Sequence, residues 1–186
     1  MMKAKKRWAK RIAAVALACA LGTGAVGALV GCSSDSKSNS DEMSVAWTSN
    51  AGEYNLDPTN NYMGWQGSYL GIYEQLFRID ANFDPQPMLA ESAEMVNDTT
   101  WKITIREGVT FQNGNELNAQ AVADCLNRTI SMNERAKKSL DIASMEADGN
   151  VLTVTTNSLN TAFKNELSEP VASIIDVNSG AAEDEP

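Results

Sequence analysis

The stretch Trp101-Lys102-Ile103-Thr104-Ile105-Arg106 decides how this chain folds. Apolar and polar residues alternate along it, so its side chains fall on two opposite faces with a period of two. Trp101, Ile103 and Ile105 share one face, which is expected to be buried, and Glu107-Gly108 ends the run. The pattern predicts a half-buried strand in an antiparallel sheet.

The residues that follow predict a turn and then a long helix. Val109-Thr110-Phe111 continues extended, and Asn113-Gly114 is typical of a turn. Asn118 can cap a helix, because its side chain can accept a backbone N–H of the first turn. The helix presents one apolar stripe, which consists of Ala119, Val122, Ala123, Leu126 and Ile130.

Shorter patterns complete a coarse prediction. Asp148-Gly149-Asn150 predicts a hairpin turn, and the spacing of apolar residues over 65–77 favours a helix. The remaining expectations are a strand over 44–47, a loop over 80–87, a second short helix over 139–145, hairpin strands over 145–147 and 151–155, a short helix over 162–167 closed by Pro170, and an extended segment over 171–177. The fold class is therefore mixed α/β (α+β), with a mixed or antiparallel sheet packed on helices.

The N-terminus predicts export. Six basic residues precede Ile12–Val30, which is almost wholly apolar, and Leu29-Val30-Gly31-Cys32 resembles a lipobox. This resemblance implies a signal peptide over 1–31, acylation of Cys32 and attachment to the outer face of the plasma membrane or within the periplasm. The Ser-rich residues 33–42 are expected to form a disordered tether. The alternative is an ordinary membrane anchor, since the apolar run is about the 20 residues that a spanning helix needs.

Charge and composition exclude several functions. None of the 24 acidic residues and six of the 15 basic ones precede Cys32, which leaves nine basic residues and a net charge of −15 beyond it. Nucleic acid is therefore not expected as a partner. The exported domain is expected to be acidic and monomeric. The chain has no histidine, so imidazole-based catalysis and most zinc sites are excluded. We expect no cofactor, no metal site and no enzyme activity.

Several motifs occur in the order found in one known family. Tyr73-Glu74-Gln75-Leu76-Phe77-Arg78-Ile79-Asp80 resembles its "YExLxxxD" motif, and 87–94 resembles "P-x-L-A-E-S-W-E" with Ala93 in place of Trp. Residues 101–111 are similar to "T-x-x-L-R-x-G-V-x-F", residues 113–122 to "D-G-x-x-x-T-A-x-D-V", and 167–176 to a later segment. The chain thus resembles the family 5 solute-binding proteins, the extracytoplasmic receptors of ABC importers for oligopeptides, dipeptides and nickel.

The resemblance implies the N-terminal part of a two-lobed, periplasmic-binding-protein-like fold over residues 43–186. Members of the family run on through a second lobe and back to the first, and they bind ligand between the lobes. We therefore expect an incomplete receptor that does not bind ligand tightly alone. An ABC permease and ATPase subunits are the partners that the resemblance implies.

Four residues are candidates for ligand contact. The resemblance places Trp47, Tyr62 and Trp65 near the ligand cleft, where aromatic rings suit apolar walls. It also implies that Arg135 faces an anionic ligand group, which a guanidinium can bind bidentately. The alternative roles are core packing for the tryptophans and plain solvation for Arg135. Cys125 is interpreted as a small buried hydrophobic residue rather than a reactive thiol.

The function predicted is that of a substrate-binding lipoprotein of an importer for oligopeptides or dipeptides. Alternatives are a receptor for nickel or a metal chelate, and a surface lipoprotein without a transport role, such as an adhesin or sensor partner, on the same fold. An exported hydrolase that uses paired carboxylates is a further class, but no acid pair in the sequence can be assigned to it.

Overall fold

The computed structural model describes residues 57–59 and 61–179, without the side chains of residues 61–64. Cys32, Trp47, the tether over 33–42 and the predicted strand over 44–47 lie outside the described residues. Within the described ranges, no helix combines the length and the apolar character that crossing a bilayer requires.

A four-stranded antiparallel sheet forms the centre of the described part. It contains β3 (Ala90–Asn97), β4 (Thr100–Ile105), β5 (Ile142–Asp148) and β6 (Val151–Thr156), in the order β3-β4-β6-β5. The predicted half-buried strand over 101–106 is β4, and the predicted hairpin turn at Gly149 joins β5 to β6. Both predictions are confirmed. Strand β3 is not among the predicted strands, and its side chains show no regular alternation of burial.

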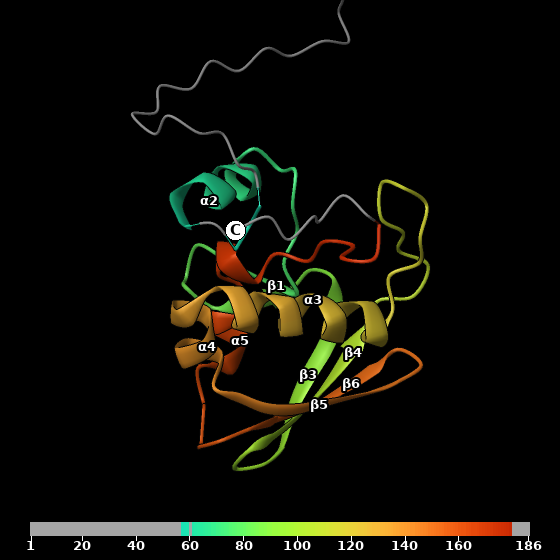
Figure 1. The fold of residues 1–186 in the computed structure, drawn as a ribbon. Helices are drawn as coiled ribbons and strands as arrows, with labels where there is room; N and C mark the ends of the chain where they lie inside the picture. Colours follow the sequence, from blue (N-terminus) through green and yellow to red (C-terminus); the bar gives the residue numbers. More distant parts are fainter. Residues whose placement is uncertain (1–56, 60, 180–186) are drawn as a thin grey trace, which may run out of the picture. The chain divides into compact units, whose positions relative to one another are not determined.

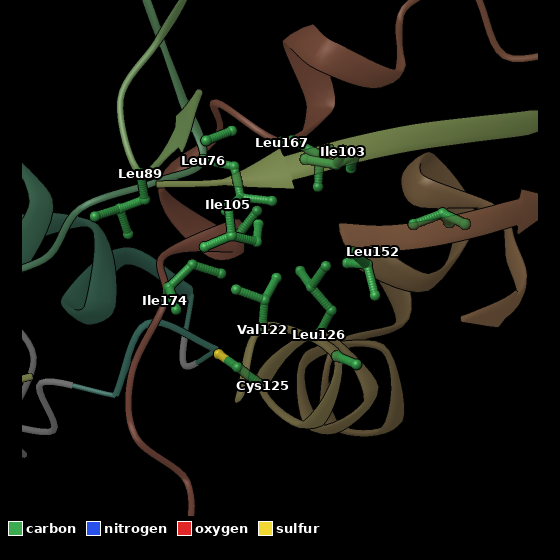
Figure 2. Packing of buried hydrophobic residues seen from close by; sticks show 14 of the residues in the cluster. Leu76, Leu89, Ile103, Ile105, Val122, Cys125, Leu126, Leu152, Leu167 and Ile174 are labelled. Atoms are coloured by element: carbon green, nitrogen blue, oxygen red, sulfur yellow. The ribbon is translucent and has the colours of Figure 1, made fainter. Parts of the chain in front are cut away.

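One face of this sheet is apolar and is covered by α3 (Ala119–Met132), as Figure 1 shows. Ile103 and Leu152 pair across β4 and β6, as do Trp101 and Val154, and all four are buried. In Figure 2, Val122 and Leu126 of α3 point toward Ile105 and Leu152. Full burial of such a side chain stabilises the fold by about 1.5–3 kcal/mol. The predicted stripe of α3 is confirmed, with Ile130 half-buried.

The long helix begins as predicted. Asn118 Oδ1 accepts a hydrogen bond from the N–H of Ala121 at 3.0 Å. The helix ends at Asn133, which is at once the first cap of α4 (Glu134–Leu140). The two helices therefore share a single junction residue with no loop between them.

The predicted helix over 65–77 is wrong beyond Tyr69. Helix α2 (Asn61–Tyr69) ends in a Schellman motif, in which Ile72 N donates to Gly67 O at 2.8 Å and Gly71 N to Ser68 O at 3.1 Å. Gly71 has a φ of +72°, which glycine adopts without strain. The apolar residues after it belong to an extended segment, where Glu74 pairs with Ile174, and to strand β1 (Phe77–Ile79).

The predicted loop over 80–87 is a turn followed by a strand. Strand β2 (Pro85–Pro87) pairs antiparallel with β1. The Asp80 carboxylate holds the turn, since it accepts from the N–H groups of Asn82 and Asp84 and from Gln86 Nε2 at 2.8–3.0 Å. Proline is tolerated here because a short edge strand needs few donors.

The predicted second helix over 139–145 is also wrong. The helix lies earlier, as α4, and Asp141 ends it in the left-handed conformation with φ of 50°. Its carboxylate accepts from Ser158 Oγ at 2.6 Å and Asn157 Nδ2 at 3.0 Å, which fixes this otherwise unfavourable geometry. Residues from Ile142 onward then form β5.

The C-terminal part closes the core. The short helix predicted over 162–167 is confirmed as α5 (Phe163–Glu166), and Phe163 packs on Trp101 with ring centroids 5.8 Å apart. The segment predicted to be extended over 171–177 differs at its start, where the 3-10 helix η1 (Pro170–Ala172) forms. Beyond η1, the buried Ser173 hydroxyl lies 2.9 Å from Ser68 Oγ and accepts from Gln75 Nε2 at 2.8 Å.

Candidate functional site

Two of the predicted ligand-binding residues meet in the structure. Arg135 lies in the first turn of α4, and its guanidinium carbon lies 5.1 Å from the ring centroid of Trp65 in α2. At this distance a guanidinium over the face of an indole is held by a cation–π interaction. The two residues are separated by seventy positions in the sequence, so only the fold brings them together.

The acidic neighbour of this pair is Glu169. Its carboxylate Oε2 lies 3.6 Å from Arg135 Nη2, just before η1. The side chain of Arg135 is 65% exposed and that of Glu169 is 43% exposed. An ion pair as open to water as this one contributes little to stability.

The arrangement suits recognition of an anionic group. A guanidinium carries five N–H donors in one plane, which matches the geometry of a carboxylate. The Trp65 ring lies against the Arg135 guanidinium and offers an apolar surface beside it. The pair could therefore hold a small ligand through its carboxylate while the indole contacts the ligand's apolar part.

A second feature ties the segment before α2 to α3. Arg128 donates through Nη1 to Asp57 Oδ1 at 3.2 Å and through Nη2 to Asp57 Oδ2. Asp57 Oδ1 also accepts from the N–H and hydroxyl of Thr59 at 2.8 and 2.7 Å. Burial alone would raise the pKa of Asp57, but the hydrogen bonds from Arg128 and Thr59 outweigh it and hold the pKa below its ordinary value.

A groove of about 780 Å³ lies beside this segment. Apolar side chains such as Leu89, Phe111 and Ile174 line it together with the carboxylates of Asp57, Glu74 and Asp176. Asp176 is engaged, since its Oδ2 accepts from Asn113 Nδ2 at 2.7 Å and Asn115 Nδ2 at 2.6 Å. These two hydrogen bonds lower the pKa of Asp176. Trp65 and Arg135 are not among the residues that line the groove.

Cys125 is buried, as the sequence predicts. Its Sγ donates to Ser173 O at 3.5 Å and accepts from Ile175 N at 3.4 Å. Burial is the main cause that raises the pKa of the thiol to about 11. A thiol with this pKa stays protonated at neutral pH and is a poor nucleophile.

The structure brings together only two of the candidate residues. Trp65 and Arg135 lie together, the backbone of Tyr62 belongs to α2 while its side chain is not described, and Trp47 and Cys32 lie outside the described residues. Glu169 and Asn133 were missed by the sequence analysis. An Asn directly before Glu134 is a recognisable helix-capping signal, whereas nothing near Glu169 in the sequence indicates its partner. In the described part, no cluster of three or more Cys, Asp or Glu side chains could hold a metal ion.

Comparison with known proteins identifies the class of protein. The family model described as "Bacterial extracellular solute-binding proteins, family 5 Middle" matches residues 84–186, which is more than half of the chain. The chain belongs to this family of solute-binding proteins. The family resemblance expected from the sequence motifs is thereby confirmed, and so is the fold class.

Individual relatives support the assignment. The nickel-binding protein NikA of Staphylococcus aureus is 33% identical over 110 residues, which cover 59% of this chain and 22% of that protein. The glutathione-binding protein GsiB of Escherichia coli is 32% identical over 109 residues, or 56% of this chain and 21% of GsiB. The chain therefore spans only about a fifth of the length of these relatives.

Solved structures agree. A crystal structure of a nickel ABC transporter from Bacillus halodurans is similar with a TM-score of 0.64 and 40% identity, covering 67% of this chain and 26% of that one. The structure of S. aureus NikA in complex with Ni(L-His)2 has a TM-score of 0.64 and 29% identity, with coverage of 68% and 27%.

Proposed function

We propose that this chain supplies part of the ligand-binding receptor of an ABC importer, with a role in capture rather than catalysis. The observation that carries the proposal is the family match over residues 84–186. Receptors of this type select ligands by closing around them. The receptor would deliver its ligand to a membrane permease driven by ATPase subunits.

The ligand proposed is a small molecule with a carboxylate, with a nickel chelate ahead of short peptides. Nickel appears in the names of relatives with 33% and 40% identity, and one similar structure was solved with Ni(L-His)2. Each histidine of that complex has a carboxylate. The exposed guanidinium of Arg135 on the Trp65 ring has the geometry to bind such a group. Peptides are the second candidate, because a relative with 32% identity is named as a glutathione-binding protein and glutathione is a peptide.

The chain itself is proposed to be exported and held at a membrane by lipid. The lipobox-like motif at Cys32, the apolar run before it and the polar residues 33–42 support this arrangement. Labelling of expressing bacteria with a palmitate analogue tests it. The analogue should mark the wild-type chain and not the Cys32→Ser variant, and equal labelling of both would overturn the proposal.

The ligand is tested by nuclear magnetic resonance on the chain labelled with ¹⁵N. Ni(II) in Ni(L-His)2 is paramagnetic, so binding should broaden the Trp65 indole signal and the amide signals around Arg135. The Arg135→Gln variant, which keeps a polar side chain without the charge, should lose the broadening. Glutathione and dipeptides serve as the second arm, because they would shift the same signals without broadening them. If neither ligand affects these signals at millimolar concentration, the proposed ligand site is wrong.

A further inference from the structure

Asn133 bonds in three directions from the junction between α3 and α4. Its backbone N–H donates to Thr129 O at 2.9 Å and so completes α3. Its side-chain Oδ1 accepts from the N–H of Ala136 at 3.0 Å and so caps α4. Its side-chain Nδ2 donates to Thr59 O at 2.9 Å. The two ends of one amide therefore serve two different segments of the chain.

The segment that receives the third bond leads into α2. Thr59 is fixed from both sides, because Asn133 holds its carbonyl while its N–H and hydroxyl donate to Asp57, which Arg128 holds in turn. Arg128 lies in α3, and Asn133 is the residue that caps its C-terminal end. Residues 57–59 are thus bound to α3 through side chains at two points, five residues apart along the helix.

Asn133 bonds next to both members of the Trp65–Arg135 pair. Arg135 stands two residues after Asn133, in the turn that the Asn133 side chain caps. Trp65 stands six residues after Thr59, in the helix that follows. A change in the Asn133 amide would move the two segments relative to each other, and the contact of 5.1 Å depends on their relative position.

We propose that Asn133 is the positioning residue of the Trp65–Arg135 site, holding the indole against the guanidinium before any ligand arrives. The proposal rests on the proposed function for its meaning in ligand capture, but the geometric part stands without it. Receptor sites gain affinity when donors are fixed beforehand, because less order has to be imposed on binding. Asn suits this junction because its short side chain carries an acceptor for the helix and a donor for Thr59 on one rigid amide plane.

The sharpest test is Asn133→Asp. This change keeps the oxygen that caps α4 and replaces the donor to Thr59 with an acceptor. Asn118→Asp is a matched control, because it makes the same chemical change at the cap at the other end of α3. The readout is the upfield ring-current shift that the Trp65 indole causes in the side-chain protons of Arg135, together with the Ala136 amide shift that reports on the α4 cap.

In Asn133→Asp the Arg135 ring-current shift should largely vanish while the Ala136 amide keeps its position, and Asn118→Asp should keep both. An unchanged Arg135 shift in a folded Asn133→Asp variant would overturn the proposal. If that variant does not fold, Asn133→Ser decides, because serine caps well but is too short to hold Thr59. In Asn133→Ser, loss of the shift supports the proposal and its retention overturns it.

Ligand titrations separate this proposal from the one above it. Broadening of the Trp65 signal by Ni(L-His)2 that weakens in Asn133→Asp supports both. The Arg135 ring-current shift could depend on Asn133 while Ni(L-His)2, glutathione and dipeptides leave the Trp65 and Arg135 signals unchanged. That result supports the positioning role and contradicts the ligand site. Binding that is as tight in Asn133→Asp as in the wild type contradicts the positioning role.

Discussion

The sheet with α3 and the segment from Asp57 to Leu89 share one apolar core, but buried polar contacts contribute more to the second region. In the sheet, Ile103, Ile105 and Leu152 are fully buried in the core to which the apolar stripe of α3 also belongs. The earlier segment also buries Leu76 and Phe77 in this core, but it adds polar attachments, among them the Asp57–Arg128 pair and the buried Gln75 amide between Ser68 and Ser173. Apolar packing tolerates many shapes, whereas a buried polar group needs its particular partner.

The largest effect should follow from a change in the sheet. Ile103→Ala removes a fully buried side chain of β4 from the core, and we expect it to lower the free energy of unfolding by about 2–5 kcal/mol. Urea unfolding followed by far-UV circular dichroism measures this. Lys102→Ala, on the exposed face of the same strand, is the control and should stay within about 0.5 kcal/mol of the wild type. Equal losses for the two variants would mean that this face of β4 is not the core.

A smaller loss of stability is expected when the polar contacts of the earlier segment are removed. Gln75→Ala removes the amide that donates to Ser68 and Ser173, both at 2.8 Å, and we expect a cost of about 1–3 kcal/mol. The exposed Gln112→Ala is the matched control, and thermal unfolding is the measurement. A neutral Gln75→Ala would break the comparison, because the segment would then not depend on its polar partners.

The Asp57–Arg128 pair should show its contribution through pH. Asp57→Asn is expected to cost about 1–2 kcal/mol at neutral pH, since hydrogen bonds to a charged group are lost. The pKa of Asp57 is held below its ordinary 3.8 in the fold, so this contribution is complete above that value and is lost as the pH falls through the folded-state pKa. The difference between wild type and variant in urea unfolding should therefore begin to shrink near pH 3.8 and disappear as the pH falls below the folded-state pKa.

The exposed Glu107→Gln variant serves as control for that experiment, because it removes a carboxylate far from any such pairing. A wild-type advantage over Asp57→Asn that persists unchanged at pH 2–3 would contradict the assigned role of the carboxylate.

The smallest effect concerns the contact between α3 and the C-terminal segment around Ser173, to which Gln75 of the earlier segment also donates. Cys125 of α3 meets Ser173 and Ile175, and its raised pKa of about 11 predicts very slow labelling by a thiol reagent at pH 8. The measurement uses the chain with Cys19→Ser and Cys32→Ser. Labelling should accelerate strongly in urea, and it should also accelerate in Gln75→Ala, which loosens the neighbouring Ser173. Labelling of the folded chain as fast as in urea would show that the interface is open.

The contrast between the regions also explains which predictions from sequence succeeded. The alternation over 101–106 and the stripe from Ala119 to Leu126 are local patterns, and the structure confirms both. The helix predicted through Phe77 failed because the apolar spacing continued past Gly71, although a glycine after a helical run is itself a stop signal. Glycine and Asn signals at helix ends should therefore outweigh apolar spacing in such segments.

The candidate site was only half predictable. Trp65 and Arg135 are predicted separately by resemblance, yet their contact joins α2 to α4 across seventy positions of the sequence. Glu169 and Asn133 act through partners far away in the sequence, at Arg135 and Thr59. No period or spacing encodes such contacts, because they arise only when the core has set the relative position of the helices.

The loop-free junction at Asn133 also limits how this region can change in length. With no spare residue between α3 and α4, one inserted or deleted residue would turn α4 by about 100° around its axis. Arg135 would then face a different neighbour, and Leu140 would leave the interior. Insertions and deletions in related sequences should thus be tolerated in the turns at Asn113 and Gly149 long before they are tolerated between Arg128 and Arg135.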